Sequence, residues 1–291
     1  MERSSSRNVM VLGAGYIGLP LAKRLKELGD NVIAWVAQQS SAESLRDEGL
    51  GVICADAAEE IAWQNNHTNS AQWDLIFFCL ATRGGDVTAY RKIHRQALSN
   101  LLKHAMSDKT KLIYCSSTSV YGNVDGSEVD EDSCAEPLVE TSKILLEAEA
   151  DVIATNGTVA RLAGIYGPGR GFLFKKFMKG EATLEQGGQR WMNQIHRDDA
   201  IAALLHLAHF EESSGQIYNI TDKQPTQYIT FYKWLSETFH KKMPPEVNAN
   251  DLGKPKRRGR TNKRVLNHKL EASGFTFRYP TFCEGYAKEA F

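Results

Sequence analysis

Three glycines near the N-terminus have the spacing of a phosphate-binding turn. The segment follows a β-branched run, precedes a helix-like stretch, and reads Gly13-Ala-Gly15-Tyr16-Ile17-Gly18. In such a turn Gly13 permits the tight bend, Gly15 lets the backbone approach a pyrophosphate, and Gly18 lets helix and strand pack closely. Backbone N–H groups and the positive end of the helix then face the phosphate charge. The strand–turn–helix context therefore predicts a dinucleotide site at Gly13, Gly15, Tyr16, Ile17 and Gly18.

The region after the second expected strand does not distinguish NAD from NADP. An acid at that point hydrogen-bonds the ribose 2′-OH of NAD, and a nearby arginine accommodates the 2′-phosphate of NADP. Residues 33–41 contain neither an acid nor a base. Gln38, Ser40 and Ser41 are candidate partners of the ribose or its phosphate, and Asp56, after the third strand, is a candidate for the adenine edge. The cofactor is therefore expected to be NAD or NADP.

Strand-like and helix-like segments alternate through the first half of the chain. The apolar runs lack period-2 alternation, which indicates strands buried on both faces of a parallel sheet. They are Val9–Leu12, Val32–Val36, Val52–Cys54, Leu75–Leu80, Leu112–Cys115 and Thr158–Leu162. Helices are predicted at 17–28, 87–106 and 138–154, with Gly29 as the stop signal of the first. This order predicts an α/β fold, a Rossmann-type doubly wound parallel sheet.

The regular alternation ends after Leu162, which predicts a second and less regular lobe. We expect a dinucleotide-binding Rossmann domain over residues 7–167 and a smaller C-terminal substrate-binding lobe over residues 168–291. Residues 195–222 are expected to return to the first domain. The elements expected after residue 167 are helices at 198–210, 228–240 and 265–273 and a short strand at 218–220.

Composition argues against several classes of function. The 291 residues include 35 Lys+Arg and 35 Asp+Glu, so no overall field attracts nucleic acid or an anionic membrane. No apolar run reaches the ~18 residues of a membrane helix, and the N-terminal MERSSSR lacks the apolar stretch of a secretory signal. Five cysteines without a CxxC pair indicate reduced thiols. Together these features predict a cytoplasmic protein.

Two further patterns bear on ligands. The eight histidines have no HxH or HExxH spacing, which argues against a metal site. The basic run from Lys254 to Arg264 has no interleaved aromatic residues, and acids elsewhere balance its charge. We therefore expect a solvated loop there and no nucleic-acid partner.

A set of motifs follows the glycine turn in a defined order. They are Ser116-Ser-Thr-Ser-Val-Tyr-Gly122, Val129-Asp-Glu-Asp132 before Pro137, Arg161-Leu-Ala-Gly-Ile-Tyr-Gly-Pro-Gly169, Ile195-His-Arg-Asp-Asp-Ala200 and Tyr218-Asn-Ile220. In this order they resemble the extended short-chain dehydrogenases/reductases of the NAD-dependent epimerase/dehydratase type. The closing stretch, from Arg264 to Pro280, is similar to a bacterial atypical branch described as YeeZ-like. The resemblance covers nearly the whole chain and implies a seven-stranded Rossmann sheet, a small substrate lobe and a homodimer formed through the helices at 87–106 and 138–154.

The resemblance also implies a catalytic unit of a Ser or Thr, a Tyr, and a Lys four residues after the Tyr. In that family the Tyr phenolate exchanges a proton with a sugar hydroxyl while the nicotinamide exchanges hydride. The Lys lowers the Tyr pKa and holds the nicotinamide ribose. Ser117 and Lys143 match the first and last members, but Val139 stands at the tyrosine position. Valine cannot donate, accept or titrate a proton.

Two hypotheses follow from the missing tyrosine. The first is an NAD(P)-binding, epimerase/dehydratase-like protein that binds dinucleotide with little or no standard turnover. The second is an active oxidoreductase, epimerase or dehydratase on a nucleotide-sugar or small substrate, with a relocated acid/base such as Glu140 or a residue of the C-terminal lobe. Tyr121 and Tyr166 are weaker substitutes, and Tyr121 is structural in the resembled family. Thr141 would face away from Lys143 on a helix.

Three more residues are candidate substrate contacts. Arg83 follows the fourth strand at the ligand-facing edge of the predicted sheet. His196 lies on the segment that returns from the lobe, where the alternative is a packing and capping turn with Asp198 as the helix N-cap. Arg258 lies where a basic residue of the resembled family grips a nucleotide-sugar pyrophosphate.

Overall fold

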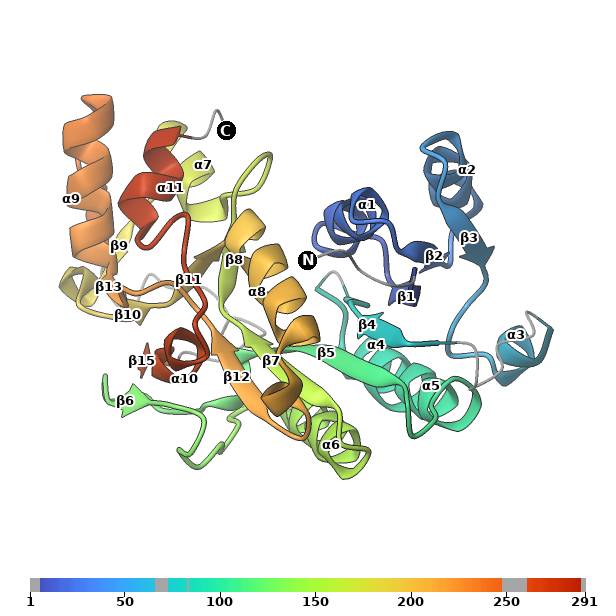
Figure 1. The fold of residues 1–291 in the computed structure, drawn as a ribbon. Helices are drawn as coiled ribbons and strands as arrows, with labels where there is room; N and C mark the ends of the chain where they lie inside the picture. The colour runs from blue at the N-terminus through green and yellow to red at the C-terminus, as the bar shows by residue number, and fades with distance from the viewer. Residues whose placement is uncertain (1–5, 66–72, 83, 248–260, 289–291) are drawn as a thin grey trace. The chain divides into compact units, whose positions relative to one another are not determined.

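The computed structural model describes residues 6–65, 73–82, 84–247 and 261–288 (Figure 1). The chain divides into two compact units, each built from three segments. The first comprises Met1–Ser116, Lys143–Ala160 and Leu204–Ile217, and the second comprises Ser117–Ser142, Arg161–Ala203 and Tyr218–Phe291.

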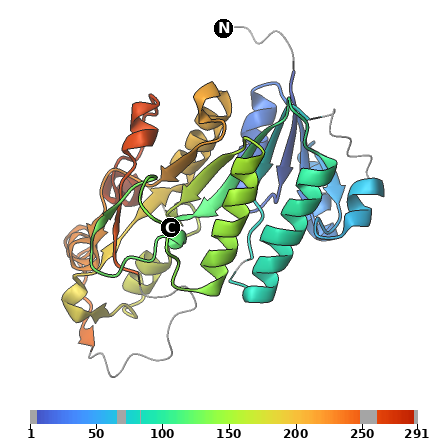
Figure 2. The ribbon, with the colours of Figure 1, turned by 90° about the horizontal axis from the view of Figure 1, so that it is seen from below.

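A seven-stranded sheet has the strand order β12-β7-β5-β4-β1-β2-β3 (Figure 2). Its strands are β1 (Asn8–Leu12), β2 (Asn31–Val36), β3 (Gly51–Cys54), β4 (Leu75–Phe78), β5 (Lys111–Ser117), β7 (Thr158–Leu162) and β12 (Ile217–Ile220). β1 pairs in parallel with both β2 and β4, β2 with β3, and β4 with β5. Chain order reverses on either side of β1, which is the switch point where open α/β sheets bind ligands. The predicted Rossmann-type sheet is confirmed.

The first unit packs its helices on the sheet through one apolar core. The helices are α1 (Gly18–Glu27), α2 (Gln39–Asp47), α3 (Glu60–Asn65), α4 (Val87–Arg91), the π-helical turn η2 (Lys92–Ala97), α5 (Leu98–His104) and α6 (Glu140–Ala154), of which the first three residues belong to the second unit. Leu101 of α5 and Val152 of α6 are fully buried in one cluster with Phe78, and Figure 2 shows α5 and α6 side by side along the sheet. Gly29 has φ 89° directly after α1, which confirms the predicted stop.

The second unit has a separate aromatic core. Its strand pairs are β6 (Glu128–Val129) with β15 (Arg264–Val265), β8 (Gly164–Tyr166) with β11 (Gln194–His196), β9 (Leu184–Glu185) with β14 (Glu246–Val247), and β10 (Trp191–Met192) with β13 (Thr226–Gln227). Its helices are α7 (Phe172–Met178), α9 (Tyr228–Phe239), α10 (His268–Ala272) and α11 (Phe282–Lys288), and α8 (Arg197–His209) contributes to both units. Tyr166 stacks on Tyr286 at 4.4 Å between ring centroids, and Phe231 meets Tyr286 edge-on at 5.3 Å. Such ring pairs add specific geometry to a large buried apolar area.

Two local expectations are wrong. The predicted helix at 265–273 is reduced to α10, because β15 pairs with β6 and the Leu266 N–H donates to the Val129 carbonyl at 2.8 Å. Asp198 is not the N-cap of α8. It lies in the first turn, where Arg197 donates to its carboxylate, and its own N–H donates to Nδ1 of His196 at 3.2 Å. His196 therefore takes the capping role.

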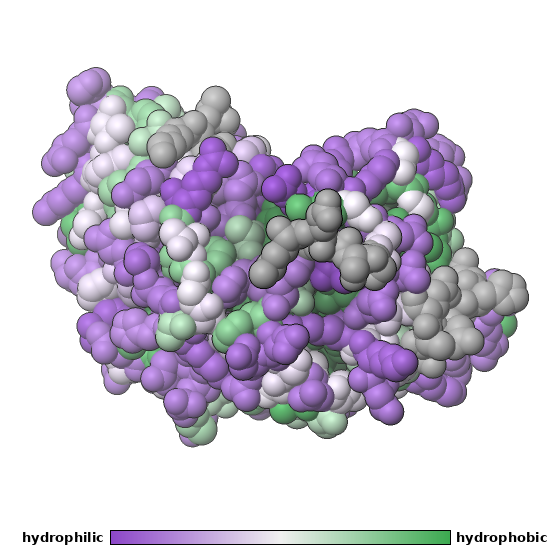
Figure 3. Space-filling view, viewed as in Figure 1, coloured by the Kyte–Doolittle hydropathy of each residue, from purple (hydrophilic) through white to green (hydrophobic). Residues whose placement is uncertain are grey.

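On the face shown in Figure 3 hydrophilic side chains predominate, and the apolar areas are small and scattered. Exposed ion pairs such as Lys23–Glu48 contribute only about 0–1 kcal/mol each, so the buried core carries the stability. Within the described residues, no helix has both the length and the apolar character needed to cross a membrane.

Candidate functional site

The packing of the first unit itself requires two of the three motif glycines. Gly13 follows β1 with φ 92°, and a Cβ on it would lie 2.8 Å from the backbone nitrogen of Leu80. A Cβ on Gly18 would lie 2.0 Å from the carbonyl oxygen of Gly13. Both distances are shorter than real side chains accept, so any other residue would push the turn apart. These two glycines let the strand, the turn and α1 approach one another.

Gly15 differs from its neighbours, because no described residue excludes a side chain there. The residue is exposed, and a Cβ on it would meet no atom of the described residues within 4 Å. α1 begins directly after the turn, its N-cap Ile17 makes no side-chain capping bond, and its first turn contains no acid. The positive end of the helix therefore has no carboxylate of its own helix beside it. An open backbone surface at a helix N-terminus fits a diphosphate, so the residues present fit a dinucleotide.

The candidate ribose contacts lie at the start of a helix that the sequence analysis did not predict. α2 begins at Gln39, with Gln38 as its N-cap and no side-chain capping bond. Gln38 and Ser40 are exposed, and Ser41 is half-buried. The first turn of α2 contains no acid. A helix N-terminus of this kind accepts a ribose hydroxyl as well as a phosphate, so it fits either NAD or NADP.

Asp56 already has partners within the first unit. One carboxylate oxygen accepts from the Ala58 N–H at 3.0 Å, and the other lies 2.6 Å from Nζ of Lys92. Partial burial works to raise its pKa, but the bond to Lys92 and the Ala58 N–H outweigh it, and the pKa is lowered. Asp56 is therefore a charged loop acid that ties the turn after β3 to η2. Its expected contact with adenine stays a prediction.

Three serines of the second unit are joined by hydrogen bonds. Ser117 caps the 3-10 turn η3 (Thr118–Val120), and its Oγ accepts from the Ser119 N–H at 3.2 Å. Oγ of the buried Ser142 donates to Oγ of Ser119 at 3.0 Å. The group holds the Ser117 turn and the start of α6 in one arrangement. Ser142 was not a predicted site residue, because nothing in the sequence marks it as a partner of the serine motif.

Val139, where the resemblance predicts a tyrosine, is the residue before α6. Val139 is half-buried, and its carbonyl accepts from the Ser142 N–H at 3.0 Å. Glu140 is the first residue of the helix and is exposed, as is Lys143 in the first turn. Val139 therefore occupies the N-cap of α6, not its interior as the sequence analysis assumed.

The hydroxyls of Tyr121 and Tyr166 are both part of the packing of the second unit. The Tyr121 hydroxyl accepts from Arg161 at 2.8 Å and lies 2.8 Å from the Asp130 carbonyl and 3.0 Å from Oδ1 of Asn219. Burial raises the pKa of Tyr121 despite the nearby guanidinium. Burial also raises the pKa of Tyr166, whose ring stacks on Tyr286. A tyrosine with a raised pKa stays protonated near neutral pH and supplies no phenolate, so neither tyrosine suits the role of a substitute base.

Lys263 is a buried cation that the sequence analysis did not single out. Only 4% of the residue is exposed, and its Nζ donates to the Tyr121 carbonyl at 2.6 Å and to Oγ1 of Thr261 at 3.2 Å. Among the described residues it forms no ion pair with a carboxylate, and burial lowers its pKa to about 8. An amine with this pKa exchanges protons near neutral pH. The sequence did not mark it as buried, because it stands at the end of a basic run whose other lysines and arginines are of the same residue types.

The remaining predicted contacts are not brought into one site. Arg83 and Arg258 lie outside the described residues. His196 is fully buried in the second unit, with its ring 3.8 Å from that of Tyr279 and 5.3 Å from that of Tyr166. This environment matches the packing and capping alternative. In the described part of the chain, no group of His, Cys, Asp and Glu side chains is arranged to hold a metal ion.

Replacing His196 with glutamine is expected to reduce the sensitivity of folding to acid. Burial lowers the pKa of His196 to about 4, so its stabilising contribution is complete above pH ~6.5 and is lost as the pH falls towards 4. Between pH 8 and pH 5 the wild type should lose about 1–2 kcal/mol more unfolding free energy than the variant. Urea unfolding followed by circular dichroism at the two pH values measures the difference. Equal losses would show that the His196 ring is protonated as easily in the folded chain as in the unfolded one.

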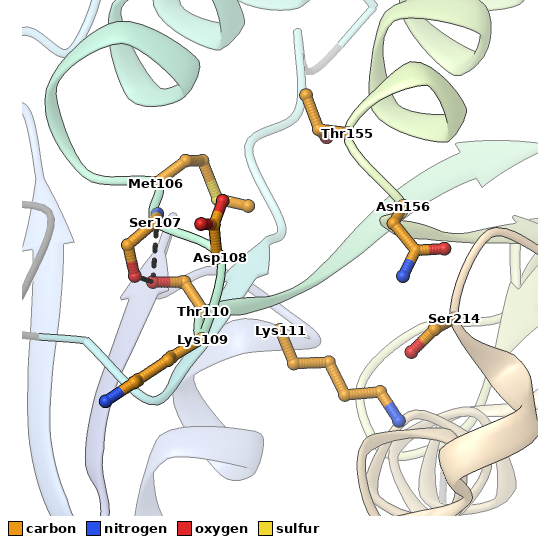
Figure 4. Close-up of a pocket in the computed structure, with 9 residues that line it drawn as sticks. All are labelled: Met106, Ser107, Asp108, Lys109, Thr110, Lys111, Thr155, Asn156 and Ser214. Carbon is orange, nitrogen blue, oxygen red and sulfur yellow. Dashed lines mark hydrogen bonds between the residues drawn. The ribbon is translucent and has the colours of Figure 1, made fainter.

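A polar cavity of about 540 Å³ lies in the first unit (Figure 4). Because β1, β4 and β5 run parallel, it lies at the opposite end of these strands from the glycine turn. It surrounds Lys111, the first residue of β5, whereas the turn follows the last residue of β1. Nζ of Lys111 donates to the Phe210 carbonyl at 2.7 Å, and burial lowers the pKa of this lysine. The lining residues are Met106, Ser107, Asp108, Lys109, Thr110, Lys111, Thr155, Asn156 and Ser214. They include none of the predicted site residues, so this cavity is separate from the glycine turn.

Comparison with known proteins places these features in context. The model of the NAD-dependent epimerase/dehydratase family matches residues 9–221. Protein YeeZ of Escherichia coli (strain K12) is 27% identical over 280 residues, which cover 94% of this chain and 97% of YeeZ. A functionally unknown conserved protein from Silicibacter pomeroyi DSS has a TM-score of 0.76 at 24% identity, over 97% of each chain. The dTDP-glucose 4,6-dehydratase of Bacillus anthracis, solved in complex with NAD, has a TM-score of 0.78 at 16% identity, over 98% of this chain and 95% of that one. At these identities the two structures establish the likeness of the fold.

Proposed function

The chain belongs to the NAD-dependent epimerase/dehydratase family, and from that premise we propose that it binds NAD or NADP at the glycine turn with little or no standard turnover. The observation that supports binding is Gly15, a glycine at which a Cβ would meet no atom of the described part of the chain within 4 Å. The packing of the protein gives no reason for a glycine there, whereas a pyrophosphate lying against the backbone does. The support for absent turnover is Val139 at the family's tyrosine position.

The residue types of the proposed site indicate which groups bind the cofactor, which orient the substrate and which could transfer a proton. Residues 13–18 would hold the diphosphate, and the nicotinamide, when bound, supplies a hydride donor or acceptor. The chain itself has to orient the substrate oxygen and move its proton. Ser117 offers a hydroxyl for orientation and Lys143 an ammonium for the ribose, but the aliphatic side chain of Val139 cannot take or return the proton. The ligands would then bind without the step that completes hydride transfer.

We assign the substrate side of this function to the C-terminal lobe over residues 168–291, with a nucleotide-sugar or a small molecule as its ligand. We also propose a homodimer formed through α4–α5 and α6, the helices through which relatives of the resembled type pair. Light scattering on the purified protein measures its mass in solution, and a monomeric mass at all concentrations would contradict the dimer.

Two measurements on the full chain test the proposed function separately. Calorimetric titration with NAD⁺, NADH, NADP⁺ and NADPH should detect at least one dinucleotide with a submillimolar Kd. Incubation of the loaded protein with a panel of nucleotide-sugars should leave the nicotinamide absorbance unchanged and yield no epimerised or dehydrated product. Failure to bind any dinucleotide at millimolar concentration would refute the claim that the protein binds NAD or NADP. Sustained turnover with any member of the panel would refute the claim that it has little or no standard turnover.

The buried amine of Lys263 supports a second candidate function, an active enzyme with a relocated acid/base. Its Nζ contacts the carbonyl of Tyr121, one residue after the 3-10 turn that carries Ser119. Its pKa of about 8 suits proton exchange at neutral pH. If turnover is found, Lys263→Met should remove it while Glu140→Gln retains it. The reverse result would assign the proton transfer to Glu140. If both variants keep their turnover, neither Lys263 nor Glu140 is the acid/base.

Replacing Gln38 with aspartate is expected to shift the cofactor preference towards NAD. Gln38 is exposed and makes no capping bond to α2, so the change should not disturb the fold. A carboxylate there accepts a hydrogen bond from the ribose 2′-OH of NAD and repels the 2′-phosphate of NADP. The ratio of the Kd for NADP to the Kd for NAD should rise about tenfold, a difference of about 1.4 kcal/mol. Calorimetry with both dinucleotides measures the ratio.

Gln39→Asp is the matched control for this change, since it adds the same charge one residue along α2, where the side chain already bonds Glu43. It should change the ratio less than Gln38→Asp. Equal ratios in all three proteins would mean that the ribose does not lie beside this end of the helix.

A further inference from the structure

Two cysteines on neighbouring strands of the first unit bring their sulfur atoms together. Cys115 lies in β5 and Cys79 directly follows β4, and their Sγ atoms are 3.6 Å apart. β4 and β5 are parallel with Phe78 opposite Tyr114, so Cys79 and Cys115 are the next pair in register. Neighbouring strands are ~4.8 Å apart, which falls within the ~4.4–6.8 Å between Cα atoms that a disulfide spans. Both cysteines are free thiols and partly exposed.

This pair lies directly against the glycine turn. The Cys79 N–H donates to the Leu12 carbonyl at 2.8 Å, which fixes Cys79 beside the last residue of β1. A Cβ added to Gly13 would come within 2.9 Å of the carbonyl carbon and oxygen of Cys79. The backbone of Cys79 and the backbone of the turn are therefore in close contact with no room between them. A small movement of Cys79 has to be transmitted to Gly13.

The side-chain alternation of the strands places the sulfur atoms away from the main core of the unit. Phe78 and Tyr114 belong to the apolar cluster that includes residues of α5 and α6. Successive residues of a strand point to opposite faces, so Cys79 and Cys115 lie on the other face, the one shared with Val11 of β1. A bond between the two sulfur atoms would not require the aromatic side chains beside them to move.

We infer that Cys79 and Cys115 form a reversible intramolecular disulfide under peroxide, and that this modification weakens dinucleotide binding at the adjacent glycine turn. The second clause rests on the proposed function, whereas the first stands on the sulfur geometry alone. Disulfides of this kind in reducing surroundings are generally transient and redox-sensing.

The chemistry balances with hydrogen peroxide as the oxidant. The Cys115 thiolate attacks one peroxide oxygen, the O–O bond breaks, and the departing hydroxide takes a proton to become water. The Cys79 sulfur then attacks the sulfenic sulfur of Cys115, so the S–S bond forms, the S–O bond breaks, and a second water leaves with the Cys79 proton. The two sulfur atoms together lose two electrons, and the two peroxide oxygens gain them. The hydrogen bond with Cys115 and partial burial raise the pKa of Cys79, which disfavours the Cys79 thiolate as the first nucleophile.

Closing the bond changes the geometry beside the turn. A disulfide is ~2.05 Å long, so the two sulfur atoms must approach each other by roughly 1.5 Å. Part of that movement falls on the backbone of Cys79, which has no free space towards Gly13. Phosphate binding by backbone N–H groups depends on their direction, so a displaced turn binds the diphosphate less well. We expect the dinucleotide Kd to rise about tenfold.

The test uses the purified full-length protein, first fully reduced and then treated with hydrogen peroxide. After alkylation of the remaining thiols, peptide mass spectrometry should recover a Cys79–Cys115 linked peptide, and dithiothreitol should remove it. Calorimetric titration with NAD⁺ and NADP⁺ should give the higher Kd in the oxidised protein and the original Kd after reduction. Cys79→Ser and Cys115→Ser should each abolish both effects. Cys134→Ser, which changes an exposed cysteine, should retain them.

Each outcome decides a separate claim. Absence of the linked peptide in protein that remains folded, judged by circular dichroism, would overturn the disulfide. A linked peptide with an unchanged Kd would overturn its effect on binding. If the reduced protein binds no dinucleotide at all, the proposed function fails and the regulatory claim fails with it, while the peptide map still decides whether the two sulfur atoms form a bond.

Discussion

Replacing Gly15 with aspartate is expected to abolish dinucleotide binding while the protein stays folded. Gly15 is exposed, its φ lies outside the left-handed region, and a Cβ there would meet no atom within 4 Å among the residues that the structure describes. An added carboxylate would occupy the surface where the diphosphate lies and would repel its charge. The loss of two charge-assisted hydrogen bonds, at ~1.5–3 kcal/mol each, predicts a rise in Kd of about 100-fold or more. Calorimetry measures the Kd, and thermal unfolding checks the fold.

The same small substitution at two glycines of the turn provides the control. Gly15→Ala should unfold at the wild-type temperature, because its Cβ projects into open space. Gly18→Ala should be destabilised by about 1–3 kcal/mol or more, because its Cβ would lie 2.0 Å from the Gly13 carbonyl oxygen. Wild-type affinity in Gly15→Asp with an unchanged melt would show that the dinucleotide does not use this turn.

The sheet could be predicted from sequence because its signals are local and redundant. Each of the first five strands and β7 is a short apolar run, and the structure keeps them with ends shifted by at most two residues. α2 was missed because its sequence is polar, with only Ala42 and Leu45 buried. β15 was missed for a different reason. Its two residues are extended only because β6 lies beside them, and no local pattern encodes a partner 136 residues away.

Part of the candidate site could also be predicted from the sequence, and part of it could not. The glycine turn is a contiguous motif, so its members could be named from spacing alone, but which glycine the packing requires could not. That distinction depends on the folded position of each absent Cβ: the Cβ of Gly18 would meet the Gly13 carbonyl within the turn, and the Cβ of Gly13 would meet the distant Cys79 and Leu80. Lys263 was hidden because its partner is the carbonyl of Tyr121, far away in the sequence. A basic residue next to other basic residues predicts solvent exposure, and only tertiary contacts reverse that expectation.

Replacing Val139 with tyrosine is expected to create turnover where the wild type has little or none. The phenol would stand four residues before Lys143, at the position where the resembled family has its proton-transfer group, with Ser117 already held in its turn by Ser119. Val139 is half-buried at the end of a loop, so a larger side chain can reach solvent without entering the core. A correctly placed general acid/base accelerates a reaction by ~10²–10⁴, and we expect a gain in that range with at least one nucleotide-sugar. The release of epimerised or dehydrated product over time measures it.

Val139→Phe is the matched control, because it adds the same ring without the hydroxyl and should remain at the wild-type level. Adding Lys143→Ala to Val139→Tyr should remove most of the gain, since an ammonium nearby lowers the pKa of a tyrosine and favours its phenolate. A gain shared by the tyrosine and phenylalanine variants would point to altered binding, because a ring without a hydroxyl cannot carry a proton. If Val139→Tyr binds dinucleotide with wild-type affinity and remains inactive on every nucleotide-sugar tested, the missing tyrosine is not what limits catalysis. Substrate binding by the C-terminal lobe would then be what limits catalysis.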